Sequence, residues 1–84
     1  MTRALNKLSV LAVKNAGPGK TSDGGGLWLY KREYGPGQWV FRYTLHGRRR
    51  EMGLGSTQTV SLKDARATAD KWRGIVAKGF DPII

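Results

Sequence analysis

Arginine and aromatic side chains share the middle third of this sequence, with a spacing that suits a surface for nucleic acid. Residues 39–43 read Trp-Val-Phe-Arg-Tyr, and residues 46–50 follow as His-Gly-Arg-Arg-Arg. Because successive strand residues point to opposite faces, Arg42 lies on the face opposite to its aromatic neighbours. Arginine can donate two hydrogen bonds to a guanine edge, and a β-ribbon fits the major groove of B-DNA, which is about 12 Å wide. The pattern therefore indicates an arginine-bearing ribbon that contacts duplex DNA.

The face of the ribbon opposite to the core carries the candidate contacts. Arg42 can donate hydrogen bonds to a guanine edge, and Thr44 can contact a thymine methyl group. Arg48 and Arg50, near the hairpin tip, are placed to reach phosphates, which position a protein but do not specify sequence. For any single arginine, solvation of an open sheet face is an equally good interpretation. The predicted DNA-binding residues are Tyr30, Arg32, Arg42, Thr44, Arg48, Arg49 and Arg50.

Strands must hold these side chains in place. Apolar residues alternate with others over residues 27–33, 38–45 and 48–54, which predicts three strands. The pair at residues 46–47, His-Gly, suits a two-residue hairpin loop. The segment at residues 23–26, Asp-Gly-Gly-Gly, predicts a turn before the first strand.

Helix signals flank the strands. Ser61, with Asp64 three residues later, is close to a capping box and predicts a helix over residues 62–78. Ser9 can cap a short helix over residues 10–15. We expect an α+β fold in which a three-stranded antiparallel sheet is packed on one face by the C-terminal helix, with a short N-terminal helical segment.

This arrangement divides the apolar residues between two sides of one core. The inward strand residues are Leu27, Leu29, Trp39, Phe41, Tyr43, Met52 and Leu54, and the helix stripe is Leu62, Ala65, Trp72 and Val76. Trp39 and Trp72 are core residues by position and receive no chemical role. The second face of the sheet is left bare.

Charge and size limit the function further. The chain has 84 residues, which predicts a single domain over residues 1–84, and a formal net charge of +9 from 15 basic and six acidic residues. This excess calls for a polyanionic partner, with nucleic acid as the leading candidate. With no cysteine and one histidine, neither a disulfide framework nor a metal site is indicated, and a reducing cytoplasm fits. We expect no enzyme activity, no cofactor, no small-molecule substrate, no membrane association and a monomeric domain.

One motif imitates a nucleotide site. Residues 19–21, Gly-Lys-Thr, end like a phosphate-binding loop. That loop requires a further glycine where this chain has Lys14, and a helix that opens at the lysine. Residues 22–24 predict a turn instead, so nucleotide binding is rejected.

Taken together, these segments resemble the N-terminal arm-type DNA-binding domain of phage and genomic-island integrases of the tyrosine recombinase superfamily. The resemblance covers about residues 8–82. It is carried by residues 22–27 (Ser-Asp-Gly-Gly-Gly-Leu), 39–43, 47–49 (Gly-Arg-Arg), 54–55 (Leu-Gly), 60–66 (Val-Ser-Leu-Lys-Asp-Ala-Arg) and 79–82 (Gly-Phe-Asp-Pro).

The resemblance implies a sheet that binds arm-type sites beside the recombination core, in bacterial cytoplasm and on the nucleoid. It places Arg42, Thr44, Arg48 and Arg49 at DNA-facing positions. It also implies a catalytic domain beyond Ile84. The sequence departs from the family's pattern at its start, and in having Tyr30 where basic residues are common.

Two other functions stay open. A three-stranded sheet with one helix also suits a double-stranded RNA-binding module, although such modules use helices and loops and here the charge lies on strands. A protein-interaction module would use Trp28 and Tyr30 on the bare face as anchors. Trp28 either contacts DNA or packs at the sheet edge under the N-terminal segment, and Glu51 is the one acid expected on this face.

Overall fold

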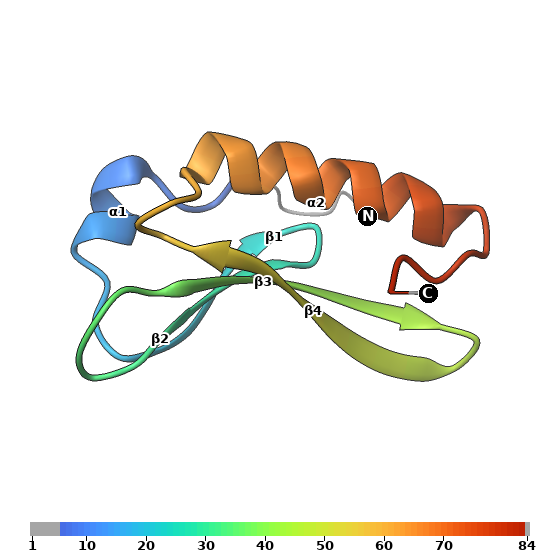
Figure 1. Cartoon of the computed structure of the whole chain (residues 1–84), viewed down its shortest axis with the longest axis horizontal. Helices are drawn as coiled ribbons and strands as arrows, with labels where there is room; N and C mark the ends of the chain where they lie inside the picture. Colours follow the sequence, from blue (N-terminus) through green and yellow to red (C-terminus); the bar gives the residue numbers. More distant parts are fainter. Residues whose placement is uncertain (1–5, 84) are drawn as a thin grey trace.

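The computed structural model describes residues 6–83, which form one antiparallel sheet with both helices on the same side (Figure 1). Strand order in the sheet follows the chain, so every connection joins neighbouring strands. The α+β class and both helices are thereby confirmed. The elements are α1 (Val10–Lys14), β1 (Gly19–Gly24), β2 (Leu27–Lys31), β3 (Gln38–Leu45), β4 (Arg48–Ser56) and α2 (Leu62–Ala77).

The sheet has four strands, so the prediction of three strands is wrong in number. The added strand is β1, which pairs with β2 so that Lys20 lies opposite Tyr30 and Ser22 opposite Trp28. Its sequence, Gly-Lys-Thr-Ser-Asp-Gly, has no apolar alternation to reveal it. An edge strand needs only backbone hydrogen bonds to its neighbour, so side-chain periodicity gives no signal here.

The β3–β4 hairpin forms the long ribbon that the sequence predicts. β3 has the predicted bounds, whereas β4 continues to Ser56. His46 and Gly47 adopt φ angles of 51° and 77°, the positive values that a tight two-residue hairpin turn requires. A bulge between Trp39 and Val40 shifts the register of the ribbon. The alternation of faces predicted for β3 is retained.

The core lies between the sheet and α2. Ser61 Oγ accepts a hydrogen bond from the Asp64 N–H at 3.1 Å, which confirms the predicted N-cap, and Ser9 Oγ caps α1 in the same way. Trp39 is fully buried and its Nε1–H donates to the Val60 carbonyl at 2.8 Å. The buried cluster is Leu27, Leu29, Trp39, Phe41, Tyr43, Leu62, Ala65 and Ala69; Met52, Leu54, Trp72 and Val76 are partly buried at its margin.

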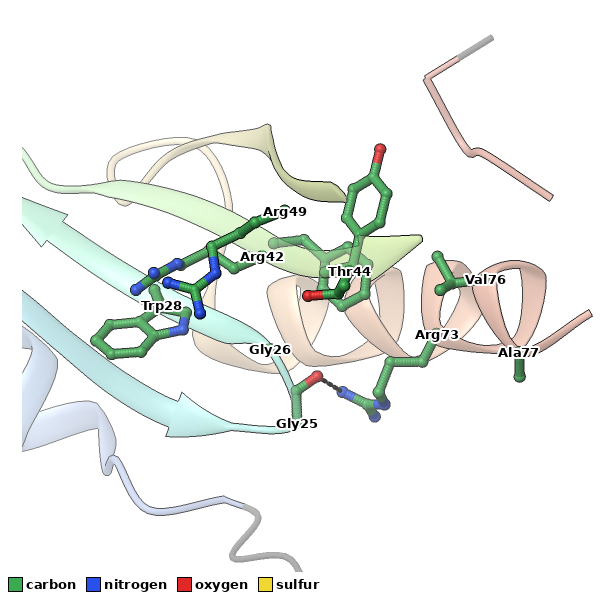
Figure 2. A pocket seen from close by; sticks show the side chains of 11 residues that line it. Gly25, Gly26, Trp28, Arg42, Thr44, Arg49, Arg73, Val76 and Ala77 are labelled. Atoms are coloured by element: carbon green, nitrogen blue, oxygen red, sulfur yellow. Dashed lines mark hydrogen bonds between the residues drawn. The ribbon is translucent and has the colours of Figure 1, made fainter. Parts of the chain in front are cut away.

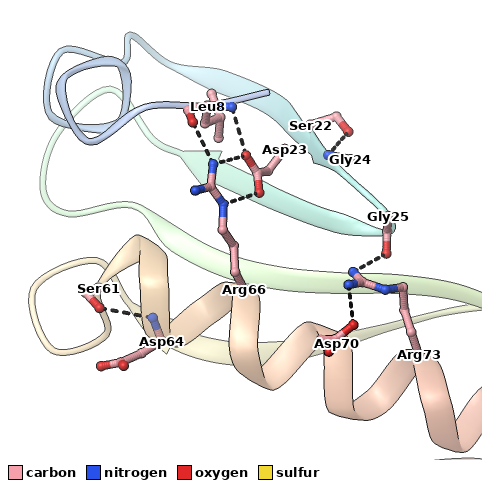
Figure 3. Close-up of polar contacts among 10 residues, drawn as sticks. All are labelled: Leu8, Ser22, Asp23, Gly24, Gly25, Ser61, Asp64, Arg66, Asp70 and Arg73. Atoms are coloured by element: carbon pink, nitrogen blue, oxygen red, sulfur yellow. Dashed lines mark hydrogen bonds and ion pairs between the residues drawn. The ribbon is translucent and has the colours of Figure 1, made fainter. Parts of the chain in front are cut away.

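A buried carboxylate connects three separate parts of the chain (Figure 3). Asp23, at 2% exposure, accepts from the Leu8 N–H at 2.8 Å and from two nitrogens of Arg66, each at 2.9 Å. Arg66 Nη2 also donates to the Leu8 carbonyl at 2.6 Å. The hydrogen bond to Asp23 raises the pKa of Arg66 above its usual value. This clamp fixes the N-terminal segment and β1 against α2.

The turn between β1 and β2 approaches β3 closely. Gly26 has a φ of 91°, and its carbonyl accepts the Arg42 N–H at 2.7 Å. A Cβ at this position would lie 2.6 Å from the Arg42 carbonyl oxygen. Arg73 of α2 donates to the Gly25 carbonyl at 3.0 Å and holds the turn from the other side. The backbone of Arg42 is therefore fixed by a glycine that no other residue can replace without strain.

Candidate nucleic-acid interface

The sheet face opposite α2, here called the outer face, collects side chains from all four strands. The pairing register places alternate residues of each strand on it. Most of them are polar or charged, unlike the residues that face α2. The outer face comprises Lys20, Ser22, Trp28, Tyr30, Val40, Arg42, Thr44, Arg49 and Glu51.

Arg42 is held between an aromatic ring and a carboxylate. Its guanidinium carbon lies 4.7 Å from the centroid of the Trp28 ring, a cation–π contact. Its Nε lies 3.4 Å from Glu51 Oε2, and the two side chains are 25% and 46% exposed. Among the hydrogen bonds within residues 6–83, none involves the terminal nitrogens of Arg42. The guanidinium is thus oriented while its donors remain open to a ligand.

Tyr30 completes the same group of contacts from β2. Its hydroxyl donates a hydrogen bond to Glu51 Oε2, and Lys20 Nζ lies 4.7 Å from the centroid of its ring. Burial and then the contact with Glu51 raise the pKa of Tyr30 above 10.0, so the phenol stays neutral at physiological pH. One carboxylate therefore joins a tyrosine of β2 to an arginine of β3.

The burial of Val40 shows that the outer face is not bare, as the sequence had predicted it to be. Although it points away from α2, it is only 8% exposed. It lies on β3, between the strands that the Tyr30–Glu51 contact joins, and opposite Trp28 in the register. We infer that these larger side chains cover it, because it is nearly buried on a face that α2 does not reach. The outer face therefore has a small apolar patch of its own beneath the charged groups.

Trp28 lies on this face in a half-buried position, with Arg42 over its ring. Of the two interpretations of Trp28, the structure does not support packing under the described N-terminal residues, because Lys7 and Leu8 bind Asp23 on the α2 side. The ring is covered by an arginine instead.

A hollow opens beside the first residues of β2, where the β3–β4 hairpin extends beyond the other strands. Figure 2 shows Arg42 and Arg49 beside Trp28 on one side of it, and Arg73 reaching the Gly25 carbonyl from α2. Thr44 also lines it. Three arginines from β3, β4 and α2 therefore line one hollow, which lies at the edge between the outer face and the α2 side.

The remaining predicted contacts are more scattered. Thr44 and Arg49 lie opposite each other on the outer face, and both are exposed. Arg32 follows the end of β2 and lines a second hollow with Lys20 and Tyr30. The predicted set thus gathers Tyr30, Arg42, Thr44 and Arg49 on one face, with Arg32 at its margin.

Arg48 and Arg50 lie on the opposite face of the ribbon, the one that faces α2. Arg48 is exposed. Arg50 Nη1 donates to Asp81 Oδ2 at 2.8 Å, and Tyr43 donates to the other oxygen at 2.7 Å. The pKa of Asp81 is lowered, first by the Ile83 N–H and then by Tyr43. Arg50 is therefore engaged in holding the segment after α2 against the hairpin.

Two basic residues of the interface were missed by sequence reasoning. Lys20 lies in β1, a strand that the sequence pattern did not predict, and Arg73 lies on the helix, outside the strands considered for contact. The alternation of Lys20 and Ser22 with Thr21 and Asp23 is the only signal for β1, and it contains no apolar residue. Separately, no helix within residues 6–83 is long and apolar enough to cross a membrane.

Comparison with known proteins gives consistent matches. A family model described as an arm DNA-binding domain matches residues 5–84. The chain is 33% identical over 84 residues to the integrase of Enterobacteria phage P4, covering 93% of this chain and 19% of that protein. It is 32% identical over 66 residues both to the integrase of Shigella phage Sf6 and to the prophage integrase IntS of Escherichia coli K12, covering 79% of this chain and 17% of each. The chain therefore spans less than a fifth of the length of these relatives.

Proposed function

This chain belongs to the arm DNA-binding domain family, a non-catalytic DNA-binding region of integrases, and we propose that the outer face of its sheet enters the major groove of duplex DNA at arm-type sites. The observation that carries this proposal is Arg42. Its guanidinium lies over the Trp28 ring, and its terminal nitrogens are open to a ligand. The β-ribbon that carries it is narrow enough to enter the major groove.

The charges around Arg42 divide into two roles. Arg42 and Thr44, on the inner strand β3, are placed to read base edges. Arg49 and Lys20, on the edge strands β4 and β1, are placed to neutralise phosphates on either side of the groove. Arg73 lines the same hollow as Arg49 and adds positive charge beside the proposed phosphate contacts.

The parent protein would use this domain to position itself on DNA. All three relatives named above are called integrases and are much longer than this chain. We infer that the parent protein is a tyrosine recombinase of phage or genomic-island origin. In it this domain would bind arm sites, and a separate catalytic region would carry out integration and excision. The domain itself would act as a monomer in the cytoplasm, on the nucleoid, with neither a cofactor nor a small-molecule substrate.

Fluorescence anisotropy with labelled duplex DNA and duplex RNA, each over a salt series, tests the binding. We expect log affinity for DNA to fall linearly with log salt, with a slope of about −0.9 for each phosphate neutralised. Duplex RNA of the same sequence should bind at least about tenfold more weakly, because its major groove is too deep and narrow for the ribbon. Equal binding of RNA would favour the RNA-binding alternative, and absence of binding to both would favour a protein partner.

A pair of charge variants localises the binding surface. Arg49→Ala removes one positive charge from the outer face, and Lys63→Ala removes one from an exposed position of α2. Arg49→Ala should reduce the magnitude of the salt slope by about one, and Lys63→Ala should leave it unchanged. If both variants reduce it equally, DNA does not bind the outer face.

A further inference from the structure

Glu51 places a negative charge on a face that we propose to bind DNA. Of the six acidic residues in the chain, it is the only one that the described strands place on the outer face. A carboxylate that approaches phosphates is repelled by them, and its presence lowers non-specific affinity. A surface selected only for affinity would carry a neutral or basic residue here.

The contacts of Glu51 suggest what offsets this cost. Its Oε2 lies 3.4 Å from Arg42 Nε and accepts the hydroxyl proton of Tyr30. The first contact is an ion pair that draws the guanidinium toward the carboxylate, while the Trp28 ring lies against its face. The second contact uses the only proton of the Tyr30 hydroxyl, so that its free lone pair can only accept.

We propose that Glu51 is a positioning residue that sets the hydrogen-bonding pattern of the outer face, presenting Arg42 as a donor and Tyr30 as an acceptor to base edges. This inference rests on the proposed function. The ligand groups that complement the pattern are a guanine edge for Arg42 and an exocyclic amino group, of adenine or cytosine, for Tyr30.

The same arrangement keeps phosphates away from the centre of the sheet. A neutral Tyr30 hydroxyl without Glu51 could rotate and donate to a phosphate oxygen, and a free Arg42 could do the same. With the carboxylate between them, phosphates are directed to the basic residues at the margins. Glu51 thus lowers total affinity and raises the difference in affinity between correct and incorrect base pairs.

The experiment uses the complete 84-residue chain and a duplex enriched from a randomised DNA pool by the wild-type chain. Affinity is measured for that duplex and for random duplex, and their ratio is the specificity. Glu51→Gln removes the charge and keeps an acceptor oxygen, whereas Glu51→Ala removes both. Asp64→Asn removes one charge from an exposed position of α2 and serves as the control.

We expect Glu51→Ala to bind random duplex more tightly than wild type and to lose about tenfold in specificity, the lower part of the range for one base contact. Glu51→Gln should bind both duplexes more tightly and retain most of the specificity, since its amide oxygen still accepts from Tyr30 and lies beside Arg42. Asp64→Asn should keep the wild-type ratio. Re-selection with Glu51→Ala should enrich a different or more degenerate sequence.

A measurement on the free protein separates this inference from the proposed function. Hydrogen exchange of the Arg42 Nε–H, followed by NMR, should accelerate in Glu51→Ala and remain slow in Asp64→Asn. Unchanged exchange, or unchanged specificity of Glu51→Ala on DNA, overturns the positioning role. Failure of wild type to bind duplex DNA overturns the proposed function, whatever the exchange result.

Discussion

Arg66 of α2 binds both carboxylate oxygens of Asp23 in β1, through Nε to Oδ2 and Nη2 to Oδ1, each at 2.9 Å. The two residues are 43 positions apart in the chain, and each belongs to a segment that carries the family resemblance. Because Asp23 is buried and Leu8 shares the contact, the pair joins β1, α2 and the N-terminal segment. These two motif residues therefore act on the fold and lie away from the outer face.

The clamp should be necessary for stability. Arg66→Met leaves Asp23 buried with its charge unpaired, which should cost about 3–5 kcal/mol of unfolding free energy. Asp70→Asn breaks only the exposed pair with Arg73 and should cost under about 1 kcal/mol. Urea denaturation of both variants measures the difference. Equal and small losses would mean that the buried pair contributes little.

Gly26 should tolerate no side chain. Gly26→Ala combines a positive φ with a Cβ placed 2.6 Å from the Arg42 carbonyl oxygen, so it should cost at least about 2 kcal/mol and disturb β3. At Gly53 nothing lies within 4 Å of an added Cβ, so Gly53→Ala is the matched control. It should leave the melting temperature nearly unchanged. Thermal melts that rank the two variants in the opposite order would contradict the close approach of Gly26 to Arg42.

Phe41 and Val40 test the two faces of β3. Phe41→Ala leaves a cavity in a thin core and should cost about 3–5 kcal/mol, enough to unfold a small domain. Val40→Ala removes two carbons from the patch under Tyr30 and Glu51 and should cost about 1–2 kcal/mol, more than a bare outer face would imply. Thermal melts decide this. Greater loss from Val40→Ala would mean that the faces are reversed.

Alkaline pH should destabilise the fold through Tyr43. Burial, and after it the hydrogen bond to Asp81, raises the pKa of Tyr43 from 10.0 to about 12. Between these values the unfolded chain binds fewer protons than the folded chain, so the stabilisation present below pH 10 is lost progressively as pH rises toward 12. Tyr43→Phe should flatten this part of the stability curve, as measured by urea denaturation across the range. An unchanged slope in Tyr43→Phe would assign the loss to other groups.

Arg42 and Arg48 should affect DNA binding differently. Arg42→Ala removes a base contact and should cost about 1–3 kcal/mol on an enriched duplex, with little effect on random duplex. Arg48→Ala removes an exposed charge near the hairpin tip and should weaken both to the same extent. Anisotropy titrations on the two duplexes measure the effects. Equal weakening by Arg42→Ala would contradict its placement at a base edge.

The local sequence was sufficient to predict the elements that have strong periodicity. The alternation in β3 predicted its bounds and faces, and Ser61 followed by Asp64 predicted the start of α2. The placement of Arg42 and Thr44 on the face opposite Phe41 follows from the same alternation. These features depend only on neighbours within a few residues, which is why a linear pattern contains them.

Tertiary structure alone decided the rest. β1 carries no apolar pattern and exists through backbone hydrogen bonds to β2. Val40 is buried because Tyr30 and Glu51 meet above β3, and Arg50 faces Asp81 only because the chain after α2 returns to the hairpin. The Tyr30–Glu51 and Arg50–Asp81 contacts join residues 21 and 31 positions apart. Their formation depends on strand register and chain reversal together, and a short sequence window contains neither.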